Sequence, residues 1–423
     1  MRGKKHRGFT MAITPGELLL YVCSYFSLFT AIFFFITFFE DKKKLRNPKL
    51  QYFPSVSVIV PAYNEEKTIT KTIQSLLKLD YPKGKLEIIV VDDGSKDSTY
   101  SSAKQFVPFG VKVFTKANSG KGDSLNFGLA RISGEFVACL DADSIVERGC
   151  LKKMLGYFED SQVMAVTPSM KIFSPTGLLQ RIQAIEYLLG VYLRKVFSYL
   201  GSIHVTPGPF TIFRKSFFDL YGGYDTHNLT EDIEIALRIQ SHKFHIENSM
   251  DANVWTIGPN TFSSLLRQRL RWYIGFLDNI QEYKHLFSRK YGNLGVFFLP
   301  GVFVSTALVI ALLFYLVYKT LTRFYTEFLD LLAINFDIWP LLKLEFKPFF
   351  LNVDPLMVLS IISLTIATMI IYLARKYSKE QSRWTFSYFL YLVLYLPLYA
   401  FWWLLSSGYK LSGKSIAWGR KGE

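Results

Sequence analysis

The chain has 423 residues, of which 50% are hydrophobic and 17% aromatic, which excludes an ordinary soluble protein and indicates several membrane segments. The formal net charge of +15 would suit a nucleic-acid-binding protein. However, the basic residues gather where apolar segments end, as in the cytosolic loops of membrane proteins. The three cysteines provide no disulfide framework, which agrees with a reduced cytosolic domain.

The first predicted element is an apolar helix over residues 18–39, a stretch without a single charged side chain. A helix needs about 20 residues to cross a bilayer core. The basic segment 1–17 before it would also fit a cleaved signal peptide. That alternative is disfavoured because the apolar run is long and no cleavage site of small residues follows it. The sequence therefore predicts an uncleaved anchor helix.

Residues 50–260 alternate like an α/β domain. Apolar, β-branched runs that predict strands occur at 56–60, 86–91, 111–114 and 136–140, and helical patterns follow at 69–77, 97–106 and 123–130. Strand–helix–strand units pair in parallel through right-handed crossovers. Ligands of such sheets bind beyond the carboxyl ends of the strands, and the polar motifs of this chain occur there.

Acidic residues follow two of these strands. Asp92 and Asp93 end the second strand, where one of them would alternatively cap the next helix. Asp141 and Asp143 follow the fourth strand, and the alternation of an extended chain points both side chains the same way. Two carboxylates that face one point favour a hard cation such as Mg²⁺ or Mn²⁺. An isolated D-x-D pair is more often a solvated turn.

Three further residues have both a functional and a structural interpretation. Tyr63 follows the first strand, where its ring would stack on a base or pack at the rim. Lys121 stands between two glycines, either close to a phosphate or in a surface loop. The stretch TEDIEIALRI predicts a helix that begins after Thr230 as N-cap, with acidic residues in its first turn.

Two segments after the strands have an amphipathic pattern, at 178–200 and within 261–285. Both suit helices that lie in the membrane interface, with core-facing helices as the alternative. Gln268, Arg271 and Trp272 share one face of the second segment. A ring and a fixed cation on one face could hold a sugar and a diphosphate.

Three more apolar segments predict membrane helices at 291–318, 355–374 and 384–409. If the α/β domain and the basic loop 375–383 lie in the cytosol, the N-terminus and the C-terminal tail are expected outside. Residues 328–352 mix apolar and charged side chains and are expected to form a re-entrant or interfacial piece.

Four motifs occur in a fixed order: DDGS at 92–95, DAD at 141–143, TED at 230–232 and QRLRW at 268–272. With this order and spacing, the chain resembles the processive family 2 glycosyltransferases, which include hyaluronan, chitin, poly-N-acetylglucosamine and cellulose synthases. The resemblance covers residues 50 to 280, and the flanking apolar segments match in layout. It implies an α/β domain of the GT-A type with interface helices and an α-helical transmembrane region.

The resemblance implies a binding site for a UDP-sugar. The residues expected on this donor side are Pro61, Tyr63, Glu65, Asp93, Lys121, Asp141 and Ala142. Tyr63 would stack on the uracil, and Asp93 would form hydrogen bonds with it. Asp143, with Asp141 beside it, would be the ligand of Mg²⁺ or Mn²⁺.

The resemblance also implies an inverting transfer with Asp232 as general base, Glu231 next to it and Arg271 as catalytic cation. The residues expected at the diphosphate and the acceptor end are Gly208, Gln268, Arg271 and Trp272. Pro207 precedes Gly208 where hyaluronan and chitin synthases carry serine, so the sugar stays open. N-acetylglucosamine is expected first and glucose second.

Several functions remain open at this point. The first is a processive synthase at the plasma membrane that extends and extrudes a β-linked polysaccharide. The second is a single transfer of one sugar to a lipid or lipid-phosphate acceptor. A non-catalytic membrane scaffold is disfavoured because the acidic set is intact. The expected partners are a UDP-sugar, a carbohydrate or lipid-linked acceptor and the lipid bilayer. No nucleic acid is expected, and a homo-oligomer is left open.

Overall fold

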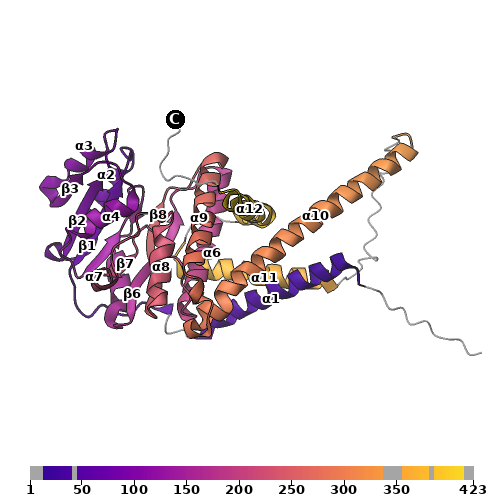
Figure 1. The fold of residues 1–423 in the computed structure, drawn as a ribbon, viewed down its shortest axis with the longest axis horizontal. Helices are drawn as coiled ribbons and strands as arrows, with labels where there is room; N and C mark the ends of the chain where they lie inside the picture. Colours follow the sequence, from indigo (N-terminus) through magenta and orange to yellow (C-terminus); the bar gives the residue numbers. More distant parts are fainter. Residues whose placement is uncertain (1–12, 41–44, 337–354, 381–384, 414–423) are drawn as a thin grey trace, which may run out of the picture. The chain divides into compact units, whose positions relative to one another are not determined.

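The structure is a computed structural model that describes residues 13–40, 45–336, 355–380 and 385–413. Its internal contacts divide the chain into two units. The larger unit comprises Phe34–Val302 and Met369–Glu423, and the smaller comprises Met1–Phe33 and Phe303–Thr368. Figure 1 shows the ribbon. Each unit is described on its own.

The larger unit is built on one eight-stranded sheet (Figure 1). Its strands are β1 (Val56–Ala62), β2 (Leu86–Asp92), β3 (Val111–Thr115), β4 (Phe136–Cys139), β5 (Ile145–Val146), β6 (Val163–Ile172), β7 (Ile212–Arg214) and β8 (His245–Thr256). They lie in the order β3-β2-β1-β4-β7-β6-β8-β5. The four predicted strands are β1 to β4, and all pair in parallel. The mostly parallel α/β sheet is therefore confirmed, with β7 antiparallel to both β4 and β6.

Some helices of this unit pack against the sheet, and others form a group next to it. In the larger unit they are α2 (Ile69–Leu77), α3 (Thr99–Lys104), α4 (Lys121–Leu129), α5 (Cys150–Leu155), α6 (Leu178–Tyr199), α7 (Lys215–Tyr221), α8 (Glu231–Ser241), α9 (Phe262–Glu282) and α12 (Thr385–Leu411). Short 3-10 turns occur at Lys83–Lys85, Val107–Phe109, Gly156–Glu159, Lys284–Leu286 and Arg289–Tyr291, and one π-helical turn at Leu294–Phe298.

The first strand shows why the sheet is buried on both faces. Every residue of β1 is buried. On one face Val58 and Val60 belong to a core with residues of α2. On the other face α4 approaches so closely that a Cβ on Gly128 would lie 2.6 Å from Ile59. A parallel strand covered on both sides reads as a continuous apolar run, which is the pattern in the sequence.

Four of the described helices are long and apolar enough to cross a membrane: Pro15–Glu40, Leu294–Ala333, Pro355–Tyr377 and Phe386–Leu411. The first contains α1 (Pro15–Glu40), the second α10 (Leu299–Ala333) and the third α11 (Pro355–Tyr377). In the smaller unit α1 and α10 pack closely, because a Cβ on Gly16 would lie 2.3 Å from the ring of Tyr315.

The predicted end of the second apolar helix at residue 318 is too early. Helix α10 continues to Ala333 through charged residues. Arg323 Nε donates a hydrogen bond to Glu327 Oε1 at 2.7 Å, one turn further on, and pairs with this spacing stabilise a helix in water. The first six residues of the predicted interfacial piece at 328–352 therefore belong to α10. Residues 337–352 lie outside the described part of the chain.

Candidate active site

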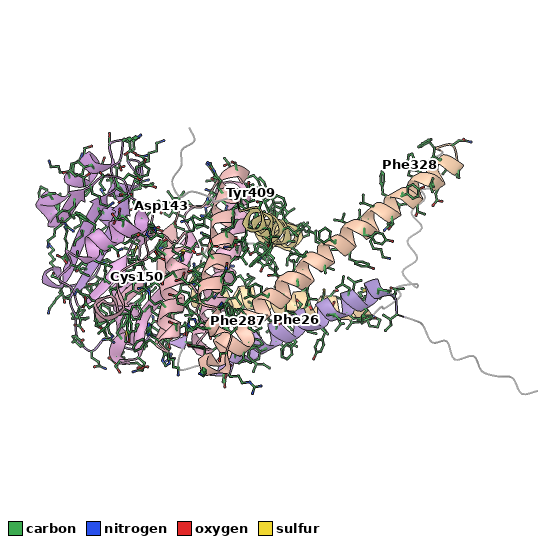
Figure 2. All side chains as sticks on the ribbon, in the orientation of Figure 1. Phe26, Asp143, Cys150, Phe287, Phe328 and Tyr409 are labelled. Atoms are coloured by element: carbon green, nitrogen blue, oxygen red, sulfur yellow. The ribbon has the colours of Figure 1, made fainter. Side chains whose placement is uncertain are left out.

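A cavity of about 290 Å³ lies beyond the carboxyl ends of β1, β2 and β4. It is lined by Pro61, Ala62, Tyr63, Glu65, Asp93, Lys121, Ser124, Asp141, Ala142, Asp143 and Arg271. The structure thus brings together every residue predicted for the donor side, along with Asp143 and Arg271. Figure 2 labels Asp143 at the margin of the α/β layer beside helices α6 and α9. The ends of the strands, the start of α4 and one residue of α9 therefore build a single site.

The Asp93 carboxylate fixes the loop between β3 and α4. It accepts hydrogen bonds from Lys116 Nζ at 2.5 Å, from the backbone N–H of Ser119 at 3.1 Å and from that of Gly120 at 2.8 Å. Asp92 accepts one from the Thr115 hydroxyl at 2.7 Å. Neither aspartate caps α3, so that alternative is wrong.

Asp97 instead forms a turn just before α3, whose N-cap residue is Ser98. The Asp97 carboxylate accepts a hydrogen bond from the Thr99 N–H at 3.0 Å. The helix predicted from residue 97 therefore starts two residues later, at Thr99. Asx turns of this kind compete with the first helical turn.

Lys121 connects two motifs that lie far apart in the sequence. Its Nζ lies 2.7 Å from Asp141 Oδ1 and 2.9 Å from Glu231 Oε1. Burial alone would lower the pKa of Lys121, but the charges of Asp141 and Glu231 outweigh burial and raise this pKa well above its ordinary value. Lys121 is the first residue of α4 and not part of a surface loop. A permanently charged lysine therefore joins the DAD and TED motifs.

Gly208 borders this ion pair. A Cβ at this position would lie 2.6 Å from Lys121 Nζ and 3.0 Å from Asp141 Oδ2. Gly208 does not line the cavity itself. The sequence predicts that Gly208 lets a ligand come close. In the structure it is the Lys121–Asp141 ion pair that lies close to Gly208, and a larger side chain at this position would displace that pair.

Asp143 has the carboxylate environment expected of a metal ligand. Burial first, and then the charges of Asp141 and Glu65, raise the pKa of Asp143 to about 7. Its Oδ1 accepts hydrogen bonds from Ser144 Oγ at 3.1 Å and Thr256 Oγ1 at 3.4 Å. Strand β5 pairs with β8 directly after the DAD motif and thereby brings Thr256 to Asp143.

A divalent cation fits this donor set. Among the described residues, no group of three or more His, Cys, Asp or Glu side chains is arranged to hold a metal ion. Mg²⁺ in nucleotide sites is commonly bound by one or two carboxylates together with substrate phosphates. Asp141 and Asp143 would supply those carboxylates, and a cation would relieve the repulsion from Asp141 and Glu65 that adds to the effect of burial in raising the pKa of Asp143.

The acidic residues of the TED motif begin α8. Burial first, and then the charge of Glu231, raise the pKa of Asp232 to about 6, although Lys121 and Arg271 act in the opposite direction. In Glu231 the effect of burial is outweighed by Lys121 and Arg271, so its pKa is lowered. The pKa values of the two adjacent carboxyls therefore differ. Glu231 stays ionised, whereas Asp232 can exchange a proton near neutral pH.

Thr230 is the residue before α8, but its side chain does not cap that helix. Its Oγ1 accepts a hydrogen bond from Asn279 Nδ2 of α9 at 3.0 Å. Close packing makes this contact, because a Cβ on Gly275 would lie 2.3 Å from Thr230 Oγ1. The N-terminus of α8 is thus held by α9. Sequence reasoning did not identify Gly275 and Asn279, and a glycine one turn before an asparagine is a weak signal on its own.

The remaining predicted residues of α9 lie outside the cavity lining. Gln268 Oε1 is buried and accepts no hydrogen bond from any residue that the structure describes. The Trp272 ring lies under the guanidinium of Arg269, 4.2 Å from ring centre to Cζ. Arg269 is only 1% exposed and pairs with Glu186 of α6 at 2.7 Å. This buried pair had not been predicted.

Comparison with known proteins agrees with this architecture. Residues 57–222 match the model of glycosyl transferase family 2. A poly-beta-1,6-N-acetyl-D-glucosamine synthase of Staphylococcus epidermidis is 32% identical over 265 residues, which is 59% of this chain and 64% of that protein. The synthase of the same name from Staphylococcus aureus strain COL is 33% identical over 225 residues, 52% of this chain and 54% of that protein. The chain therefore spans less than two thirds of the length of these relatives.

Among solved structures, a mannosyltransferase of Pyrobaculum calidifontis in complex with GDP-Man and Mn²⁺ superposes with a TM-score of 0.58 at 18% identity. The match covers 84% of this chain and 99% of that one, and at this identity it shows a shared fold. The family match begins in β1, includes the DDGS and DAD motifs and ends after α7. Residues 57–222 therefore resemble glycosyl transferase family 2, and the chain shares the GT-A-type fold of that mannosyltransferase.

Proposed function

We propose that the chain is a membrane-bound, inverting glycosyltransferase that transfers N-acetylglucosamine from UDP-N-acetylglucosamine to a growing β-linked polysaccharide. The observation that carries this proposal is the position of Lys121. This lysine forms ion pairs with Asp141 of the donor cavity and with Glu231, the neighbour of Asp232. Lys121 would therefore connect the donor cavity with the helix that carries the proposed general base, Asp232.

The donor site would hold the nucleotide at the ends of β1 and β2. Tyr63 would stack on the uracil, and Asp93 would form hydrogen bonds with it. Asp141 and Asp143 would hold Mg²⁺ or Mn²⁺, which when bound offsets the negative charge of the diphosphate. Carboxylates outnumber cationic side chains in the cavity lining, so an anionic nucleotide needs such a cation for favourable binding.

Asp232 would act as the general base. An acceptor hydroxyl would lose its proton to this carboxylate as its oxygen attacks the anomeric carbon, and the bond to UDP would break. A positioned base contributes about 10²–10⁴-fold. A pKa near 6 keeps Asp232 mostly ionised at neutral pH and still basic enough to take the proton. Arg271, which lines the cavity, would stabilise the charge on the departing diphosphate.

Three arguments support the choice of product and location. The relatives are named as synthases of a β-linked N-acetylglucosamine polymer, and glucose is the second candidate sugar. The long apolar helices suit a multi-pass protein of the plasma membrane. The α/β domain would then lie in the cytosol, where nucleotide sugars occur. Extrusion of the polymer and any homo-oligomer are parts of the same proposal.

The test is a turnover assay on the purified full chain. UDP-N-acetylglucosamine, UDP-glucose and GDP-mannose are supplied separately with Mg²⁺, Mn²⁺ or EDTA, and nucleotide release and product length are measured. We expect UDP release from UDP-N-acetylglucosamine that EDTA abolishes, together with a polymeric product. A product with one added sugar on a lipid would instead establish the non-processive alternative.

Matched aspartate variants separate a catalytic from a scaffold role. Asp232→Asn should abolish release, whereas Asp219→Asn should retain it, because Asp219 is exposed and its ion pair is with Lys215 on the same helix, α7. Unchanged release by the Asp232 variant would contradict the assignment of the base.

A further inference from the structure

Helix α12 is long and apolar, yet the chain on both sides of it is tied to the α/β domain. Just before it, Lys171 Nζ of β6 lies 3.1 Å from Glu380 Oε2 and donates a hydrogen bond to the Ser378 carbonyl at 2.7 Å. Lys379 Nζ lies 2.9 Å from Asp251 of β8. Because five peptide steps reach at most about 18 Å, α12 must begin close to this edge of the sheet.

The other end of α12 is tied to the catalytic layer as well. Lys410 forms an ion pair with Asp278 of α9. The next residue, Asn279, donates hydrogen bonds to Asn228 and Thr230, just before the helix that carries Asp232. Lys410 is therefore held against α9, close to the start of α8.

Between its ends, α12 packs across the two predicted interface helices, α6 and α9. Figure 1 shows those helices from the side and α12 nearly end-on, so α12 crosses both. Tyr395 OH donates a hydrogen bond to Glu186 at 3.4 Å. Trp402 lies 5.4 Å from the Arg269 guanidinium, and the Trp403 ring lies 4.8 Å from that of Tyr273.

We propose that α12 does not cross the bilayer. It lies instead in the plane of the membrane surface on the side of the α/β domain, with its free apolar face at the boundary between headgroups and acyl chains. A 27-residue helix is about 40 Å long, so perpendicular to a hydrocarbon core of about 30 Å its ends would lie on opposite faces. Here the segment before α12 is bound to strands β6 and β8, and its last turn is bound to Asp278 of α9 next to the start of α8, so both ends lie on the side of the α/β domain.

The side chains of α12 suit this position. Its exposed apolar residues are Phe386, Phe389, Leu392, Val393, Leu396, Phe401, Leu404 and Leu411. On the face turned to α6 and α9, Tyr391, Tyr395 and Tyr399 stack in series through the middle of α12. In membrane-spanning helices Trp and Tyr gather at the two interfaces. The lipid surface is therefore the partner of the exposed apolar residues of α12.

The inference places residue 412 on the same side of the membrane as the α/β domain, in contrast to the outside location expected from the count of apolar segments. Single cysteines at Ser412, Ser101 of α3 and Asp330 near the end of α10, in a Cys23→Ala background, are treated with an impermeant maleimide in sealed vesicles. The other native cysteines are buried. Ser412→Cys should react in the same vesicle orientation as Ser101→Cys, and Asp330→Cys in the opposite one. A Ser412 thiol that reacts opposite to Ser101 would overturn the proposal.

A depth measurement provides a second test that needs no catalytic turnover, so it stands or fails apart from the proposed activity. Nitroxide labels at residues 389, 393 and 404 on the exposed face of α12 should report one common depth in lipid bilayers. If α12 crossed the membrane, the first and last would differ by about 22 Å. Labels at Val358 and Met369 of α11, which are exposed, serve as the spanning control. A depth gradient along α12 like that along α11 would show that α12 crosses.

Discussion

At the scale of single residues, the raised pKa of Asp232 makes the reaction pH-dependent. Burial and the charge of Glu231 raise this pKa to about 6. Because the base must be ionised to accept a proton, kcat/KM should fall about tenfold per pH unit below pH ~6. With an aspartate of ordinary pKa, kcat/KM would begin to fall only below pH ~4. The profile is measured at saturating Mg²⁺ or Mn²⁺, so that Asp143 stays ionised.

The neighbouring carboxylate provides the control for that profile. Glu231→Gln removes a negative charge beside Asp232 and leaves Lys121 to act on Asp232. Both changes favour the ionised form of Asp232, so the acidic limb should move to lower pH while the maximal rate falls. An acidic limb that stays in place in this variant would assign the titration to another group.

Gly275 is a second residue whose effect can be measured. A Cβ here would lie 2.3 Å from Thr230 Oγ1, so Gly275→Ala forces α9 away from the start of α8. We expect the free energy of unfolding to fall by about 1–3 kcal/mol and kcat to fall at least tenfold, because Asp232 moves with Thr230. Thermal unfolding and initial rates in detergent measure both effects.

Gly190 in α6 is the matched control. The nearest atom to a Cβ there would be the Arg194 guanidinium, at an ordinary 3.7 Å. Gly190→Ala should therefore be neutral or stabilise the helix by about 0.5–1 kcal/mol. Equal losses in the two variants would mean that α6 and α9 tolerate no added methyl group, and the specific role of Gly275 would be wrong.

At the scale of elements, helices α6 and α9 are joined by a buried charge pair. Arg269 is 1% exposed and lies 2.7 Å from Glu186. Removing one partner leaves a buried charge uncompensated, so Glu186→Leu should lower the free energy of unfolding by about 3–5 kcal/mol. The double variant Glu186→Leu/Arg269→Met should regain most of that loss. Its activity should stay low, because Trp272 still lacks the guanidinium that stacks on it.

The exposed pair Lys215–Asp219 on α7 calibrates this experiment. Asp219→Ala should change the free energy of unfolding by less than about 1 kcal/mol. A Glu186→Leu variant as stable as the Asp219 variant would show that Arg269 finds water or another acceptor, against the burial seen here.

The parallel strands and the donor side of the site could be predicted from the sequence because both depend on local pattern. A buried strand followed by DDGS or DAD places its acids at the carboxyl end of the sheet whatever the rest of the chain does. The Lys121–Glu231 contact, the burial of Arg269 and the approach of Gly275 could not be predicted. Each of these contacts joins segments that lie far apart in the sequence, and the hydrophobic periodicity of a segment does not indicate which other segment it will pack against. The α3 start was misplaced for a local reason, the Asp97 turn.

At the scale of the whole molecule, the boundary of the catalytic part lies within α1, a helix long and apolar enough to cross a membrane. The sequence places the start of the α/β domain at residue 50, yet the larger unit begins at Phe34. Phe38 of α1 is fully buried, stacks on Tyr192 of α6 at 4.6 Å between ring centres and meets the edge of Tyr377 at 5.4 Å. The Tyr192 hydroxyl donates a hydrogen bond to the Phe34 carbonyl at 3.1 Å. The last turns of α1 are therefore part of the catalytic unit's core.

This packing predicts that the α/β domain is not stable without α1. Phe38→Ala should lower the free energy of unfolding by about 3–5 kcal/mol, as other buried phenylalanines do. Phe29→Ala in the same helix should have little effect, since Phe29 is 49% exposed. Thermal unfolding of both variants in detergent gives the comparison, and a truncated protein that starts at residue 50 should aggregate or lose UDP-sugar turnover. If that protein stayed monomeric and fully active in aqueous buffer, the α1–α6 contact would be dispensable and the domain boundary predicted from the sequence would be the physical one.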